Sequence, residues 1–178
     1  AVAAQGAIGV IAAVGIGMSE PDFDTNFLEA NLRALGREIR IAKSRTDGVI
    51  GVNIMVALTH YDRYVRTAID SGVDVIFSGA GLPTGLPAFV DPSAHTKLVP
   101  IVSSGRAAAL ICRKWSGTHG RLPDAFVVEG PLAGGHLGFK LDQIDDPRYN
   151  LESILLDTLA AVKMYEEQGG QKIPVIAA

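Results

Sequence analysis

The stretch AFVVEGPLAGGHLG, residues 125–138, opens as a short apolar run and continues as a glycine-rich loop with one acid and one histidine. An almost wholly apolar run of this length is typical of a strand buried on both faces. In the loop, Gly134 and Gly135 place no Cβ in the way of a flat ligand. Beside them, Glu129 offers a hydrogen-bond acceptor and His136 can transfer a proton. The stretch predicts a buried strand that leads into a binding or catalytic loop, although by itself it also fits a capping or structural histidine.

Five more apolar runs of this kind occur along the chain, separated by helices or helix-length loops. Such alternation predicts a parallel sheet, either doubly wound or closed as a barrel, with the site at the carboxyl ends of the strands. Polar residues follow several successive strands and no G-x-G-x-x-G opens a helix, which favours the barrel. A complete TIM barrel has eight strands and roughly 250 residues, so we predict an incomplete one. The six candidates are residues 8–14, 49–55, 73–77, 98–102, 125–128 and 173–178.

Four stretches carry apolar residues at three- and four-residue spacing, which is typical of helices that pack on a sheet. On the charged outer face of the first, Glu29 and Arg33 have the spacing of an i,i+4 ion pair. Asn150 is placed to cap the last helix, and Gly169 and Gly170 to end it. The predicted helices cover residues 28–42, 61–69, 107–115 and 151–162.

The composition predicts one compact domain over residues 1–178 and narrows the classes of partner. The chain is 48% hydrophobic with a net charge of −3, and no basic run is interleaved with aromatics. We therefore expect small molecules or other copies of the chain as partners, and neither nucleic acid nor a membrane surface. The first residues fit neither a signal peptide nor a membrane span. A single cysteine, Cys112, excludes an internal disulfide and a cysteine metal cluster, and it fits a reducing cytoplasm.

Six segments carry a resemblance that covers almost the whole chain. They are GVI at 9–11, GVN at 51–53, SGAG at 78–81, VPIV at 99–102, EG at 129–130 followed by AGGH at 133–136, and IPVIAA at 173–178. In this order they resemble the nitronate monooxygenase family, formerly called 2-nitropropane dioxygenases, and the similar flavin-dependent enoyl-ACP reductase II. AGGH is the most specific of the six.

The resemblance implies a TIM barrel that binds FMN without covalent attachment. It implies oxidation of a nitronate, the anion of a nitroalkane, by flavin and oxygen to a carbonyl compound and nitrite. His136 matches the catalytic histidine of the family, Asn53 the strand-end asparagine at the flavin, and Gly134 the glycine whose backbone touches the flavin. Ser78 and Ser103, at two other strand ends, are further expected flavin neighbours, and no metal is expected.

The sequence departs from the family pattern at two places. Glu129, which we expect at the flavin together with Gly135, stands where many members have Gln. Pro131 and Leu132 stand where many members have an acidic residue before the alanine. The family also has an earlier first strand and one or two later βα units, so we expect residues 1–178 to be part of a longer flavin-binding barrel domain.

Three alternatives to nitronate oxidation stay open at this point. The first is reduction of an enoyl thioester with FMN and NAD(P)H, which uses the same motifs. The second is an inactive flavin-binding barrel. The third is a phosphate-binding barrel without flavin, such as an isomerase or aldolase, but no lysine stands at a strand end to form a Schiff base.

Overall fold

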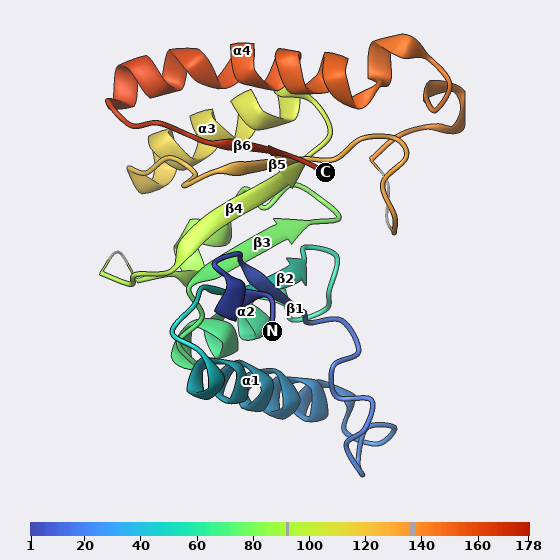
Figure 1. Cartoon of the computed structure of the whole chain (residues 1–178), viewed down its shortest axis with the longest axis vertical. Coiled ribbons are helices and arrows are strands. Elements are labelled where there is room, and N and C mark those ends of the chain that lie inside the picture. Colours follow the sequence, from blue (N-terminus) through green and yellow to red (C-terminus); the bar gives the residue numbers. More distant parts are fainter. Residues whose placement is uncertain (92, 136–137) are drawn as a thin grey trace. The chain divides into compact units, whose positions relative to one another are not determined.

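A computed structural model describes residues 1–91, 93–135 and 138–178. Strands and helices alternate along the chain, and the strand order is β1-β2-β3-β4-β5-β6 (Figure 1). The predicted α/β class, with six parallel strands of a TIM-type barrel, is confirmed. The strands are β1 (Gly9–Ala12), β2 (Ile50–Met55), β3 (Val75–Gly79), β4 (Lys97–Val102), β5 (Phe126–Val128) and β6 (Val175–Ala177). The α-helices are α1 (Phe27–Arg45), α2 (Tyr61–Asp70), α3 (Gly105–His119) and α4 (Leu151–Gly169). Short 3-10 turns are η1 (Ala3–Gln5), η2 (Leu86–Phe89), η3 (Leu141–Gln143) and η4 (Pro147–Tyr149).

The chain forms two compact units, which are described separately. The first unit contains Ala1–Phe77 and Ala88–Lys97, and the second contains Ser78–Pro87 and Leu98–Ala178. The boundary falls inside β3, so the last two residues of that strand belong to the second unit. The predicted extent of a single domain stays a prediction.

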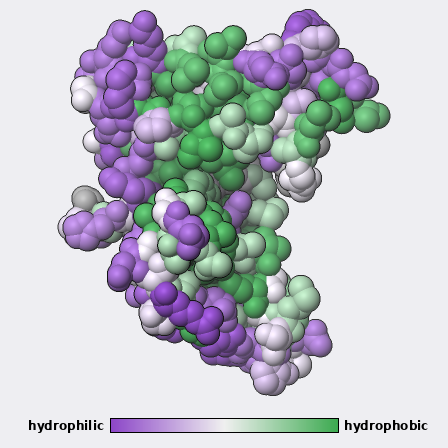
Figure 2. All heavy atoms as spheres, in the orientation of Figure 1, coloured by the Kyte–Doolittle hydropathy of each residue, from purple (hydrophilic) through white to green (hydrophobic). Residues whose placement is uncertain are grey.

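In the first unit, β1 and β2 pair in parallel, with Gly9 opposite Ile50 and Ala12 opposite Asn53. Helix α1 packs against α2 and β2. Its apolar stripe includes Leu32, Leu35 and Ile39, which are buried at three- and four-residue spacing. Hydrophilic side chains gather over the outer surface of α1 (Figure 2). The sequence pattern thus places this helix correctly.

The predicted ion pair between Glu29 and Arg33 is wrong. In the described part of the chain, Glu29 pairs instead with Arg63 of α2, at 2.7 Å. Arg33 binds two carboxylates of the segment before the helix, Asp22 and, at 3.4 Å, Glu20. Helical spacing shows only partners on the same helix, so these tertiary partners could not be read from it.

In the second unit, β4, β5 and β6 pair in parallel, and α4 packs against α3, β5 and β6 (Figure 1). Trp115 of α3 is fully buried, and its indole nitrogen donates a hydrogen bond to the carbonyl of Pro83 at 3.0 Å. Cys112 is buried on the same helix, and burial raises the pKa of its thiol to about 12. The thiol is therefore a packed apolar group and not a nucleophile.

Equivalent aspartates stabilise the amino ends of strands in both units. The Asp74 carboxylate accepts a hydrogen bond from the N–H of Ile50 at 2.7 Å, and that of Asp124 from the N–H of Leu98 at 2.9 Å. Each carboxylate also pairs with a basic side chain. These acids satisfy the first N–H group of β2 and the second N–H group of β4, so we assign them a structural role, as expected for the amino-terminal face of a barrel.

Candidate active site at the carboxyl ends of the strands

In the second unit, the carboxyl ends of β4 and β5 present Ser103 and Glu129 as neighbours. Val102 and Val128, the residues just before them, are partners in the parallel register. The Glu129 N–H donates to the Val102 carbonyl at 2.9 Å, which extends the pairing past the end of β5. Both side chains are half-buried. The structure thus brings together two of the predicted site residues at one edge.

Ser78 lies near the end of β3 in the same unit and is fully buried. The next residue, Gly79, touches β4 so closely that a Cβ there would lie 2.9 Å from the Cβ of Ile101. Ala80 follows with a φ of 51°, a left-handed conformation that residues with a Cβ rarely adopt. Uncommon backbone conformations cluster at functional sites, and nothing in the sequence around Ala80 predicted this one.

The loop after β5 has open backbone at two glycines. Gly134 and Gly135 are exposed, and a Cβ built on either would meet no atom of the described residues within 4 Å. Gly135 has a φ of 93°, which favours glycine. Among the described residues, the backbone at these two glycines is therefore open, and a flat ring against it stays a prediction. His136, the expected catalytic residue, lies outside the described residues.

Asn53 belongs to the first unit and is described there by itself. It lies on β2, is half-buried, and its carbonyl accepts a hydrogen bond from the Ala13 N–H at 3.0 Å. Pairing with β1 therefore continues one residue beyond the end of that strand. The position of Asn53 near the carboxyl end of its strand is the one that the sequence predicts.

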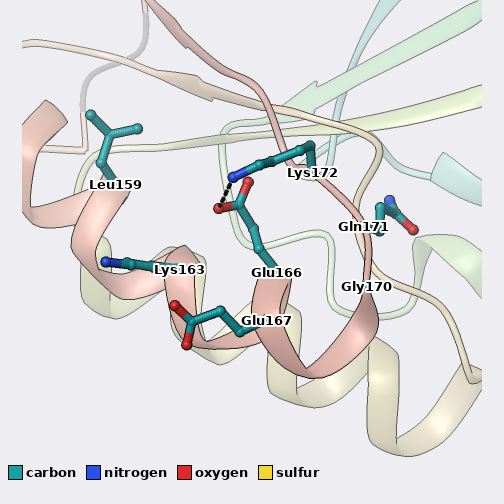
Figure 3. A pocket seen from close by; sticks show the side chains of 7 residues that line it. All are labelled: Leu159, Lys163, Glu166, Glu167, Gly170, Gln171 and Lys172. Carbon is teal, nitrogen blue, oxygen red and sulfur yellow. Dashed lines mark ion pairs between the residues drawn. The ribbon is translucent and has the colours of Figure 1, made fainter.

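A pocket of about 430 Å³ lies elsewhere, at the end of α4 and in the segment that leads to β6 (Figure 3). In this pocket, the Glu166 carboxylate accepts a hydrogen bond from the Ile173 N–H at 2.8 Å. It also forms an ion pair with Lys172 at 3.6 Å. This pocket is at the amino end of β6, away from the predicted site, and we assign it no chemistry. Its lining residues are Leu159, Lys163, Glu166, Glu167, Gly170, Gln171 and Lys172.

Two other features are absent from the described residues. In residues 1–91, 93–135 and 138–178, no group of three or more His, Cys, Asp or Glu side chains could hold a metal ion. Within the same ranges, no helix combines the length and the apolar character needed to span a membrane.

A comparison of the sequence with models of known protein families identifies the family of this chain. The family model for nitronate monooxygenase matches residues 1–178. The chain belongs to the nitronate monooxygenase family. A search of curated proteins found no match.

Two solved structures are similar to this chain over nearly its whole length and over about half of their own. FabK from Thermotoga maritima is 26% identical, with a TM-score of 0.67 over 99% of this chain and 44% of that one. A nitroalkane oxidase from Streptomyces ansochromogenes is 19% identical, with a TM-score of 0.69 over 99% of this chain and 52% of that one, and it supports the fold alone. The chain spans about half the length of the solved structures that it matches.

Proposed function

We propose that this chain is part of a flavin-dependent oxidoreductase that uses FMN and oxygen to convert alkyl nitronates to a carbonyl compound and nitrite. The observation that carries the proposal is the open glycine backbone at Gly134 and Gly135, which follows β5 in a chain that matches the family over residues 1–178. We further propose small-molecule substrates, no nucleic-acid or membrane partner, a cytoplasmic location and the capacity to self-associate.

The described residues fit a flat cofactor at the carboxyl ends of the strands. Gly134 and Gly135 would lie against the ring, because neither carries a side chain and, among the described residues, no atom lies within 4 Å of a Cβ built there. When bound, the flavin supplies the redox chemistry, and the protein supplies orientation and electrostatics. We propose that the remaining contacts come from Asn53, Ser78, Ser103 and Glu129.

We assign the proton-transfer step to His136. An imidazole with a pKa of about 6.5 can accept the proton on the carbon next to the nitro group, which converts a nitroalkane to its nitronate. Once protonated, the same ring carries a positive charge that can hold the anionic nitronate. The histidine therefore serves both as a base and as an anion stabiliser.

A substitution at Gly134 tests the predicted contact with the flavin. Gly134→Ala should leave the stability of the flavin-free protein unchanged, because the new Cβ meets no protein atom within 4 Å. It should raise the dissociation constant of FMN about tenfold, equivalent to about 1.4 kcal/mol, because the Cβ enters the space of the ring. Fluorescence titration of FMN into the full-length flavin-free protein measures this constant.

The matched control for this test is Gly117→Ala on α3, where an added Cβ also meets open space. The control should bind FMN as the unmodified protein does. Equal FMN affinity in all three proteins would show that the flavin does not lie against Gly134.

The second candidate reaction is reduction of an enoyl thioester by NAD(P)H through the same flavin. Its support is the 26% identity to FabK from Thermotoga maritima, together with the motifs that the chain shares with the flavin-dependent enoyl-ACP reductase II. The two reactions differ in the electron donor: NAD(P)H in one and the nitronate itself in the other.

Absorbance spectra of the full-length protein separate the candidates. Under anaerobic conditions, NADPH should leave the flavin band of a nitronate oxidase in place, and an alkyl nitronate should bleach it. Bleaching by NADPH would favour the enoyl reductase. A yellow protein that responds to neither donor would indicate an inactive flavin-binding barrel, and a protein without a flavin band would indicate a barrel of another kind.

A further inference from the structure

The loop that follows β3 in the second unit is fixed at both of its ends. At the first end, a Cβ on Gly79 would lie 2.9 Å from the Cβ of Ile101 on β4, so the backbone there already touches its neighbour. At the second end, Pro83 is buried, and its carbonyl accepts the hydrogen bond from the Trp115 indole at 3.0 Å. Residues 80–82 must therefore connect two fixed points.

Trp115 supports the second end of this loop from the interior of the unit. Its side chain is fully buried on α3. The Pro83 carbonyl also accepts a hydrogen bond from the Leu86 N–H at 3.2 Å, so both of its lone pairs are used. Leu86 is itself fully buried. A donor that is held by core packing fixes the point at which the loop ends.

The backbone between the two fixed points has an uncommon conformation. Ala80 has a φ of 51° and Gly81 a φ of 124°, values that favour glycine. An alanine keeps such a conformation only where its surroundings hold it there. The hydrogen bond from Trp115 supplies part of that constraint, because a loop with a free second end would relax to an ordinary conformation.

We propose that Trp115 is a positioning residue, which holds the loop after β3 in the conformation that binds the flavin. This inference rests on the proposed function for the identity of the ligand. The loop begins beside Ser78 at the carboxyl end of β3, the edge at which a barrel binds its ligands. Gly81 is exposed and Ala80 half-buried, so the backbone of the loop is accessible. Trp115 acts through the Pro83 carbonyl and needs no contact with the flavin.

Trp115→Phe is the first variant of the test, because phenylalanine keeps an aromatic ring in the core and removes the N–H donor. In the full-length protein, we expect the dissociation constant of FMN to rise about tenfold, the size that corresponds to the loss of one buried hydrogen bond. In the flavin-free protein, the amides at 80–82 should exchange their hydrogens about tenfold faster for the same reason. Fluorescence titration and mass spectrometry measure the two quantities.

Ile111→Val is the matched control on the same helix. Ile111 is also fully buried, and the loss of one methyl group should lower the global stability without removing a hydrogen bond. This variant should keep the FMN affinity and the loop exchange of the unmodified protein. If Trp115→Phe matches Ile111→Val in both quantities, Trp115 serves only the core and the positioning role is wrong.

A double-variant cycle with Ala80→Gly tests whether Trp115 acts through the loop. Glycine adopts a φ of 51° without steric cost, so the loop in this background depends less on its support. Trp115→Phe should therefore weaken FMN binding only about threefold in the Ala80→Gly background, against about tenfold in the unmodified one. An equal loss of affinity in both backgrounds would refute the proposal.

Gly81→Ala tests the loop without a change in the core. Alanine is strained at a φ of 124°, so this variant should also weaken FMN binding about tenfold, and it keeps the test open even if Trp115→Phe fails to fold. Unchanged FMN affinity in Gly81→Ala would show that flavin binding does not need this loop conformation, which overturns the positioning role.

Hydrogen exchange separates this inference from the proposed function. If the unmodified full-length protein binds no FMN, but Trp115→Phe speeds exchange at 80–82 and Ile111→Val does not, the support of the loop by Trp115 stands and the ligand of the site is not FMN. If the unmodified protein binds FMN, but neither Trp115→Phe nor Gly81→Ala changes the affinity, the assigned cofactor stands and Trp115 does not position the site.

Discussion

Replacing His136 with alanine should lower the turnover of a neutral nitroalkane by about 10²–10⁴-fold, the contribution typical of a general base. The full-length variant should still bind FMN, because the proposed flavin contacts lie at other residues. A nitronate supplied as the anion no longer needs the proton removed, so its oxidation should fall less. Steady-state rates with both substrates, on protein with equal flavin content, give this comparison.

The matched control is His119→Ala, which removes an imidazole from the last residue of α3. This variant should keep the rates of the unmodified protein with both substrates. Unchanged rates in His136→Ala would rule out the catalytic assignment. An equal fall with nitroalkane and nitronate would rule out proton removal as the main role of the histidine.

The sequence predicted the elements of the fold because these depend on local patterns. In the described part of the chain, each of the six predicted apolar runs overlaps one strand, although β3 ends two residues later and β4 begins one residue earlier than its run, and the last helix has the predicted ends. The Asn150 side chain accepts a hydrogen bond from the Ser153 N–H at 2.8 Å. Gly170, just after α4, has a φ of 62°, the left-handed conformation in which helices commonly end.

The sequence could not show which glycines are crowded. Gly134 and Gly138 are four residues apart in one motif, yet only Gly138 lies against another side chain. That difference arises from Ser103, which is distant in the sequence and becomes a neighbour only after folding. The same limit explains the partners of Arg33, which come from the segment before its helix.

For the candidate site, the sequence predicted the edge but not the contacts at it. The carboxyl ends of parallel strands share an edge, which is enough to expect Ser103 next to Glu129. The left-handed backbone of Ala80 and the hydrogen bond from the Gly105 N–H to the Asp157 carboxylate depend on tertiary packing, so local sequence patterns could not show them.

Two glycines of helix α3 should respond to alanine in opposite directions. At Gly105 a Cβ would lie 2.5 Å from the backbone carbonyl oxygen of Asp157, so Gly105→Ala should lower the free energy of unfolding by about 1–3 kcal/mol. At Gly117 the Cβ meets open space, and Gly117→Ala should raise that free energy by about 0.5–1 kcal/mol, since alanine favours the helix. Urea denaturation of the full-length protein measures both.

The atom responsible at Gly105 distinguishes this contact from the one at Ser103. The nearest obstruction is a backbone oxygen, so Asp157→Ala should not restore Gly105→Ala, and should itself destabilise the protein by leaving the Gly105 N–H without its acceptor. Recovery of stability in the double variant would show that the Asp157 side chain, at 2.7 Å, causes the collision. Equal stability of Gly105→Ala and Gly117→Ala would contradict the close approach of α3 and α4.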